Sequence, residues 1–180
     1  VLTINGDPDR ARDIVRSAIN LNPSDALYRA LAEVEVARLG ALFNREDVPV
    51  DTVRVQFQEI LGSAIDAGRK ATEIDNTNYE NWLALGRVYA AVVSLNIDGA
   101  YENAVASFDV ARKLKPKGPA LALERARLEA AHGDTDAARE HASSAVALKN
   151  NYSDAIFFLA QIDVSEGNTR GAITSLEAAT

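Results

Sequence analysis

The chain has 180 residues, of which 47% are hydrophobic and only 6% aromatic, a composition that suits one domain with a core of closely packed helices. Because it contains no cysteine, disulfides and thiolate metal sites are excluded. The net charge of −7, with 19 basic residues scattered along the sequence, argues against nucleic acid or an anionic membrane as a partner.

The first predicted element is a helix over residues 8–21, which follows Asp7 and stops before Pro23. We interpret it as the second helix of a hairpin whose first helix is absent. The chain begins at Val1 and has no methionine, so we expect it to be a piece of a longer protein. No apolar run approaches the ~18 residues of a membrane span, so we expect no direct membrane insertion of this segment.

A lengthened hairpin is predicted over residues 24–75. Its first helix ends near Phe43, and the polar residues 44–51 form the connection. A second helix begins near Thr52, with Asp51 or Thr52 as its cap. Its apolar residues recur at helical spacing: Val53, Phe57, Ile60, Ala64, Ala67, Ala71 and Ile74. This pattern predicts a long helix with one apolar face.

The next predicted hairpin, residues 78–116, carries the most specific pattern in the chain. Its positions fit W-x2-L-G-x2-Y, then A-x3-F and a closing proline: Trp82, Leu85, Gly86, Tyr89, Ala104, Phe108 and Pro116. The small residues Gly86 and Ala104 allow two helices to approach, and Pro116 cannot continue the second helix. The pattern resembles the tetratricopeptide repeat (TPR) family, which implies a right-handed superhelical stack of antiparallel helical hairpins.

The last part of the chain repeats itself after 34 residues. The predicted repeat over residues 119–149 recurs in a truncated repeat over residues 153–180, whose final helix begins near Arg170. The matched positions are Gly133, Asp134, Ala138 and Ala145, followed by Gly167, Asn168, Ala172 and Ala179. A constant offset of this kind is typical of stacked repeats.

The register of the tryptophan position divides the chain into uneven repeats. That position falls on Arg29, Trp82, Ala122 and Ile156. The intervals are 53, 40 and 34 residues, so two repeats are lengthened, the first around residues 44–51 and the second at residues 95–100. The sequence therefore predicts a single all-α domain over residues 1–180, with about nine helices.

The resemblance also implies where a partner binds, because in this family the first helices line a concave face that holds an extended peptide or a partner helix. We expect six residues to form this partner-binding groove: Leu83, Arg87, Leu123, Arg127, Phe157 and Gln161. The three apolar side chains would form its floor. Arg87 and Arg127, about 10 Å apart on neighbouring helices, would bind a carboxylate of the partner. Alternatively, both arginines are solvated or paired with local acids such as Glu80 and Glu124.

No catalytic residue, cofactor or metal site is expected. His132 and His141 have no cysteine or carboxylate at the spacing of a metal site. Ser143 and Ser144 follow His141 on one predicted helix, which is not the geometry of a nucleophile and its base. The leading interpretation is therefore a scaffold that binds a protein or peptide carrying acidic groups, and not an enzyme.

Two alternatives stay open. Residues 78–89, followed by residues 97–101, loosely resemble the repeat regions that follow the membrane spans of bacterial O-antigen ligase or polymerase-like proteins. That resemblance implies a soluble accessory tail of a membrane-anchored bacterial glycan ligase or polymerase. In the other alternative, the chain is a self-assembling scaffold, because a stack without polar capping helices exposes apolar surface at its repeat ends.

Overall fold

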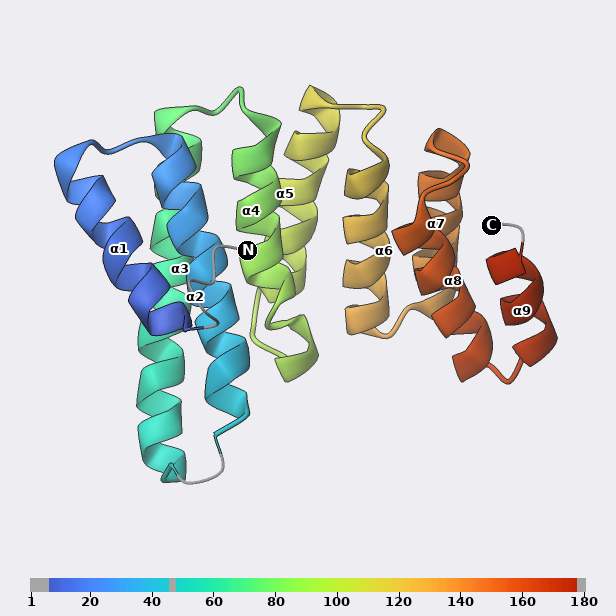
Figure 1. The fold of residues 1–180 in the computed structure, drawn as a ribbon, viewed down its shortest axis with the longest axis horizontal. Coiled ribbons are helices and arrows are strands. Elements are labelled where there is room, and N and C mark those ends of the chain that lie inside the picture. Colours follow the sequence, from blue (N-terminus) through green and yellow to red (C-terminus); the bar gives the residue numbers. More distant parts are fainter. Residues whose placement is uncertain (1–6, 46–47, 178–180) are drawn as a thin grey trace. The chain divides into compact units, whose positions relative to one another are not determined.

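The structure is a computed structural model that describes residues 7–45 and 48–177. Within these ranges the regular elements are helices, so the predicted all-α fold is confirmed. They comprise nine α-helices and one short 3-10 helix (Figure 1): α1 (Pro8–Leu21), α2 (Asp25–Phe43), α3 (Val50–Ile74), α4 (Tyr79–Ala90), η1 (Val93–Leu95), α5 (Ala100–Leu114), α6 (Pro119–His132), α7 (Thr135–Leu148), α8 (Ser153–Ser165) and α9 (Thr169–Glu177).

The backbone contacts divide the chain into two units, Val1–Val92 and Val93–Thr180. The first unit contains α1 to α4, and the second contains η1 and α5 to α9. The boundary lies inside the hairpin predicted over residues 78–116. The division into repeats within one domain therefore stays a prediction.

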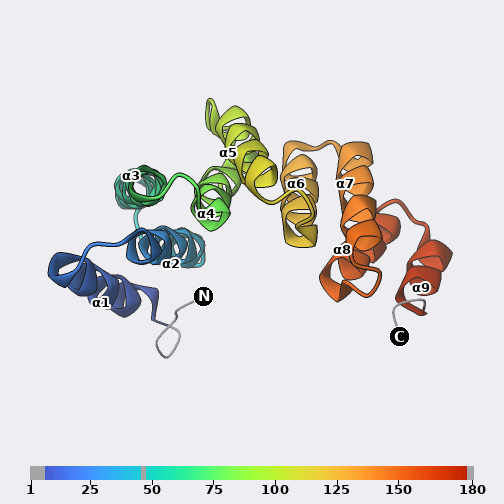
Figure 2. The same cartoon turned by 90° about the horizontal axis from the view of Figure 1, so that it is seen from above.

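The first unit is built around the long hairpin of α2 and α3, which lie side by side (Figures 1 and 2). Ala32, Ala64 and Ala67 are at most 3% exposed, and their small side chains allow the two helices to approach closely. The apolar core also includes Val15 of α1 and Val88 of α4. One core thus connects all four helices of this unit.

The start of α3 differs from the prediction. The helix begins at Val50, and its N-cap is Pro49, which makes no side-chain hydrogen bond, so neither Asp51 nor Thr52 is the cap. Proline has a fixed φ and lacks the backbone N–H that would need a partner at a helix start. Asp51 lies in the first turn, where the helix dipole favours its negative charge and Arg54 lies 3.5 Å away.

Two turns of the second unit show the 34-residue repeat in three dimensions. Gly133 follows α6 and Gly167 follows α8, and both have left-handed backbone conformations with φ of 93° and 79°. Glycine adopts this conformation without strain. Asp134 and Asn168 then cap the next helix, because each side chain accepts a hydrogen bond from the backbone N–H three residues further on. The same sequence pattern therefore builds the same turn twice.

The core of the second unit joins α6, α7 and α8, which follow one another in Figure 2. Its buried members are at most 1% exposed: Leu123, Ala126, Ala142, Ala145 and Ala155. Larger side chains at the edge of this core, Tyr152, Phe158 and Leu159, are partly buried against it. Alanine at most of the buried positions keeps these helices close together.

Candidate functional site

The six residues expected to form a groove are divided between the two units. Leu83 and Arg87 lie on α4 of the first unit, four residues apart and therefore on one face of that helix. Leu83 is only 8% exposed, and Arg87 is half-buried. Little of the Leu83 side chain is therefore accessible to a partner.

The other four residues lie on α6 and α8 of the second unit. Leu123 is 1% exposed and belongs to the core, so its side chain stabilises the packing of the helices. The remaining three side chains are accessible: Phe157 is 61% exposed, Arg127 is 49% exposed and Gln161 is also exposed. Val164, 59% exposed, follows Gln161 on α8. We call Phe157, Gln161 and Val164, which recur at helical spacing, the α8 stripe.

In each unit a local acid binds an arginine of a first helix. Arg127 lies 3.2 Å from the carboxylate of Glu124, three residues earlier on α6. Glu80 lies 3.1 Å from Arg29. A guanidinium group has five N–H donors, so the ion pair with Glu124 holds Arg127 in place while other donors remain for a second acceptor.

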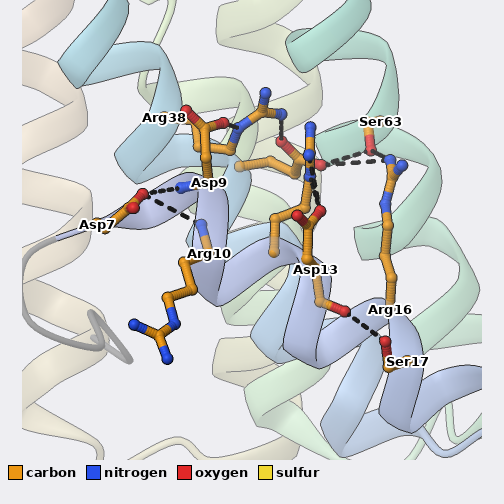
Figure 3. A network of polar contacts seen from close by, with 10 residues as sticks. Asp7, Asp9, Arg10, Asp13, Arg16, Ser17, Arg38 and Ser63 are labelled. Atoms are coloured by element: carbon orange, nitrogen blue, oxygen red, sulfur yellow. Dashed lines mark hydrogen bonds and ion pairs between the residues drawn. The ribbon is translucent and has the colours of Figure 1, made fainter.

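The structure contains a charged network in the first unit that is not among the residues predicted from the sequence. Glu35 of α2 is 0% exposed, and its carboxylate accepts hydrogen bonds from Arg38 at 2.5 Å and from the Ser63 hydroxyl at 2.9 Å. Arg16 donates to the same hydroxyl at 3.0 Å and lies 3.5 Å from the carboxylate. Arg38 also donates to Asp9 at 2.6 Å (Figure 3). One buried carboxylate therefore connects α1, α2 and α3.

A cavity of about 320 Å³ between α1, α2 and α3 adjoins this network. Its charged lining residues are Asp9, Arg12, Arg16, Arg38, Arg45 and Glu59. Arg10 does not line it, and its side chain points away from Arg38 and Ser63 (Figure 3). Four guanidinium groups thus surround one cavity in a chain whose net charge is negative.

A buried amide connects α2, α3 and α4. Asn81 is 0% exposed, and its side-chain nitrogen donates to the Asp25 carboxylate at 3.0 Å and to the backbone carbonyls of Ala71 and Asp75 at 3.2 and 2.9 Å. Its side-chain oxygen accepts a hydrogen bond from Arg29 at 2.7 Å. The hydrogen bond from Asn81 is the main reason why the pKa of the Asp25 carboxyl is lowered. Asp25 therefore stays ionised at neutral pH.

Two further buried acids lie in the second unit, 34 residues apart. Glu129, 3% exposed, accepts hydrogen bonds from Arg125 at 2.6 Å and from the Tyr101 hydroxyl at 2.9 Å. Asp163, 5% exposed, accepts one from Arg139 at 2.8 Å. Both acids stand at the tyrosine position of the repeat pattern. Each replaces a large packed ring by an ion pair.

His141 of α7 is half-buried, and its pKa is lowered from the usual 6.5. Burial is the main cause, because it disfavours the charged imidazolium, and the positive charge of Arg125 adds to it. Arg112 acts in the same direction, whereas Glu129 and Glu140 oppose the shift. His141 is therefore neutral in the folded chain at pH 7.

An NMR pH titration of His141 is expected to give an imidazole pKa below 6.5. The unfolded chain then binds the proton more tightly than the folded chain. The contribution of His141 to stability is thus complete above pH 6.5 and decreases as the pH falls from there through the folded pKa. A titration midpoint at or above 6.5 in the folded protein would contradict this expectation.

Within the described ranges, no group of three or more His, Cys, Asp or Glu side chains is placed to hold a metal ion. Among the helices that the structure describes, none is both long and apolar enough to cross a membrane.

The chain has no match among protein-family models or curated proteins. Solved structures resemble it in fold. One is TTC0263, a thermophilic TPR protein of Thermus thermophilus, with 20% identity over 97% of this chain and 82% of that chain and a TM-score of 0.74. MamA has 16% identity over 97% of this chain and 88% of its own, with a TM-score of 0.60.

A third similar structure is a monomeric mutant of IFIT1 with Gppp-AAAA. It has 17% identity and a TM-score of 0.65, and the match covers 97% of this chain but 44% of that one. The chain thus spans less than half the length of IFIT1. At these identities the likeness concerns the fold. The resemblance to O-antigen ligase repeats has no counterpart in the three structures named and stays a prediction.

Proposed function

Because the chain has the tetratricopeptide-repeat fold, we propose that it is a protein-interaction scaffold that binds a segment of a partner protein along the first helices of its hairpins. The observation that carries the proposal is the α8 stripe. Phe157 and Val164 each expose more than half of their side chains. Covering such apolar surface is favourable by roughly 25 cal/mol per Å².

Arg127 indicates a second property of the partner segment, an acidic side chain. It lies on α6, which shares a core with α8, and it is 49% exposed. Its ion pair with Glu124 restricts the side chain, so less freedom is lost when a partner carboxylate binds. We therefore infer that the partner segment combines an apolar side chain with an acidic one. Arg87, half-buried on α4, extends this proposal to the first unit, whereas Leu83 is too little exposed to contact a partner.

Peptides selected from a random-sequence display library on the intact chain provide the test. We expect them to carry an aromatic or large aliphatic residue together with an acidic residue. Their affinity should fall by about thirtyfold in Phe157→Ala, since an interface anchor contributes ~2 kcal/mol or more. Arg127→Glu should weaken the same peptides, because it places a negative charge where their carboxylate binds. Calorimetric titration of each variant measures both effects.

Ile173→Ala on α9 is the matched control, because Ile173 is 51% exposed but lies on a second helix. Equal affinity for the wild type and Phe157→Ala, or an equal loss in the Ile173 control, would contradict the proposed surface. Light scattering over a concentration series tests the self-assembly alternative. If the chain associates with itself and Phe157→Ala abolishes that association, the stripe binds a second copy and not a foreign partner.

A further inference from the structure

We propose that the arginine-lined cavity of the first unit binds a small phosphate-bearing anion. This inference goes beyond the scaffold function, because it concerns a different site, between α1, α2 and α3, and a ligand of another class. It rests on the cavity between α1, α2 and α3, on the donors that its arginines leave unused, and on the buried carboxylate that holds two of these arginines.

The charges around the cavity are balanced. Four arginines and two carboxylates line it. Two further carboxylates lie against these arginines from outside the lining, because Asp13 pairs with Arg12 and Glu35 pairs with Arg38. A phosphate group is therefore held by the guanidinium donors that remain unused, and not by an excess of positive charge. The cavity of about 320 Å³ is also larger than a single carboxylate group requires.

The arginines of the cavity retain donors for a ligand. Arg12 uses its Nε and one Nη for Asp13, and Arg38 uses its Nε and one Nη for Asp9 and Glu35, so each keeps its other Nη. Arg45 has no carboxylate partner among residues 7–45 and 48–177. These donors come from α1, from α2 and from the segment that follows α2. Tetrahedral phosphate accepts hydrogen bonds from several directions, whereas one arginine suffices for a planar carboxylate.

The buried Glu35 carboxylate positions two of the four arginines. It binds Arg38 at 2.5 Å and lies 3.5 Å from Arg16, whose Nη is held by Ser63. A buried ion pair adds little to stability compared with apolar side chains of the same volume. Glu35 does, however, fix the side chains on two sides of the cavity, which lowers the entropy that they lose when an anion binds.

The test measures binding of inorganic phosphate, pyrophosphate and glycerol phosphate to the intact chain by calorimetry at constant ionic strength. We expect saturable binding that weakens at least about tenfold in Arg12→Gln combined with Arg45→Gln. Neither residue contacts Glu35, so both substitutions preserve the buried network. The control is Arg10→Gln combined with Arg54→Gln, which removes the same charge from the same unit outside the cavity, and its affinity should equal that of the wild type.

The probes also separate the sources of the phosphate group. Tighter binding of glycerol phosphate than of inorganic phosphate assigns the site to a small organic phosphate, and the reverse order assigns it to the free anion. Malonate, a dicarboxylate, should bind at least about tenfold more weakly than pyrophosphate. Three results would overturn the proposal: no saturable binding of any phosphate, equal binding to the cavity variant, or equal binding of malonate.

Discussion

Replacing Asn81 with leucine is expected to lower the free energy of unfolding of the first unit by about 3 kcal/mol. Asn81 is 0% exposed and takes part in four hydrogen bonds. Leucine has the same branched shape but no polar atoms, so the backbone carbonyls of Ala71 and Asp75 lose a donor in a place that water does not reach. Asp25 and Arg29 lose their shared partner as well. Each group left unsatisfied contributes ~1–3 kcal/mol to the loss.

Chemical denaturation followed by the fluorescence of Trp82 measures this effect in the first unit. Trp82 is the only tryptophan of the chain, and its ring N–H donates to the backbone carbonyl of Asn76 at 2.8 Å. Asn76→Ala is the matched control, because the Asn76 side chain is exposed and its backbone carbonyl is retained. The control should stay within ~0.5 kcal/mol of the wild type. A leucine variant as stable as this control would show that the buried amide contributes no net stability.

Arg38→Met is expected to destabilise the first unit by a similar amount, about 3 kcal/mol. The substitution leaves the Glu35 carboxylate buried without its shortest ion pair. Arg16 cannot replace it fully, because it lies 3.5 Å away and its side chain is 51% exposed to water. Removing one partner of a buried pair is costly because the other charge stays in a medium of low dielectric constant.

The double variant Glu35→Leu with Arg38→Met tests this explanation. With both charges of the pair removed, Arg16 still donates to the Ser63 hydroxyl and no carboxylate stays buried there without its partner, so the stability should return to within ~1 kcal/mol of the wild type. Arg12→Met is a control from the same cavity, since its partner Asp13 is 67% exposed, and it should change the stability by less than ~0.5 kcal/mol. If the double variant is as unstable as Arg38→Met, the loss comes from packing and not from the unpaired charge.

The sequence predicts the helices well, because their apolar periodicity and their capping residues are local signals. Phe43 ends α2 as expected, and the 34-residue offset between Gly133 and Gly167 produces the same turn twice. The predicted cap of α3 is wrong, and the helix begins at Val50, two residues before Thr52. A proline and an aspartate near one helix end both favour a start, and local pattern alone does not decide between them.

The candidate site was predictable only in part. A position on a first helix tells which residues share a face, but not how far the next hairpin covers them, so Leu123 proved to be buried while Phe157 is exposed. For the Glu35 network, the sequence does contain a signal from which it could have been predicted. Glu35 lies four residues from both Leu31 and Leu39, within the buried stripe of α2, and a charge in such a stripe needs a partner. The identity of that partner, Arg38 with Ser63 of another helix, depends on tertiary structure.

The long hairpin of α2 and α3 shows how a stack of short repeats accommodates a much longer one. These helices have 19 and 25 residues, whereas α4 has 12, so α3 is longer than α4 by roughly 20 Å at 1.5 Å per residue. Both helices of this hairpin are long, and Phe43 contacts Phe57 near their shared end, with ring centroids 5.8 Å apart. Growth of one helix alone would have left its apolar stripe uncovered. Two helices that are lengthened as a pair therefore cover part of each other's apolar surface.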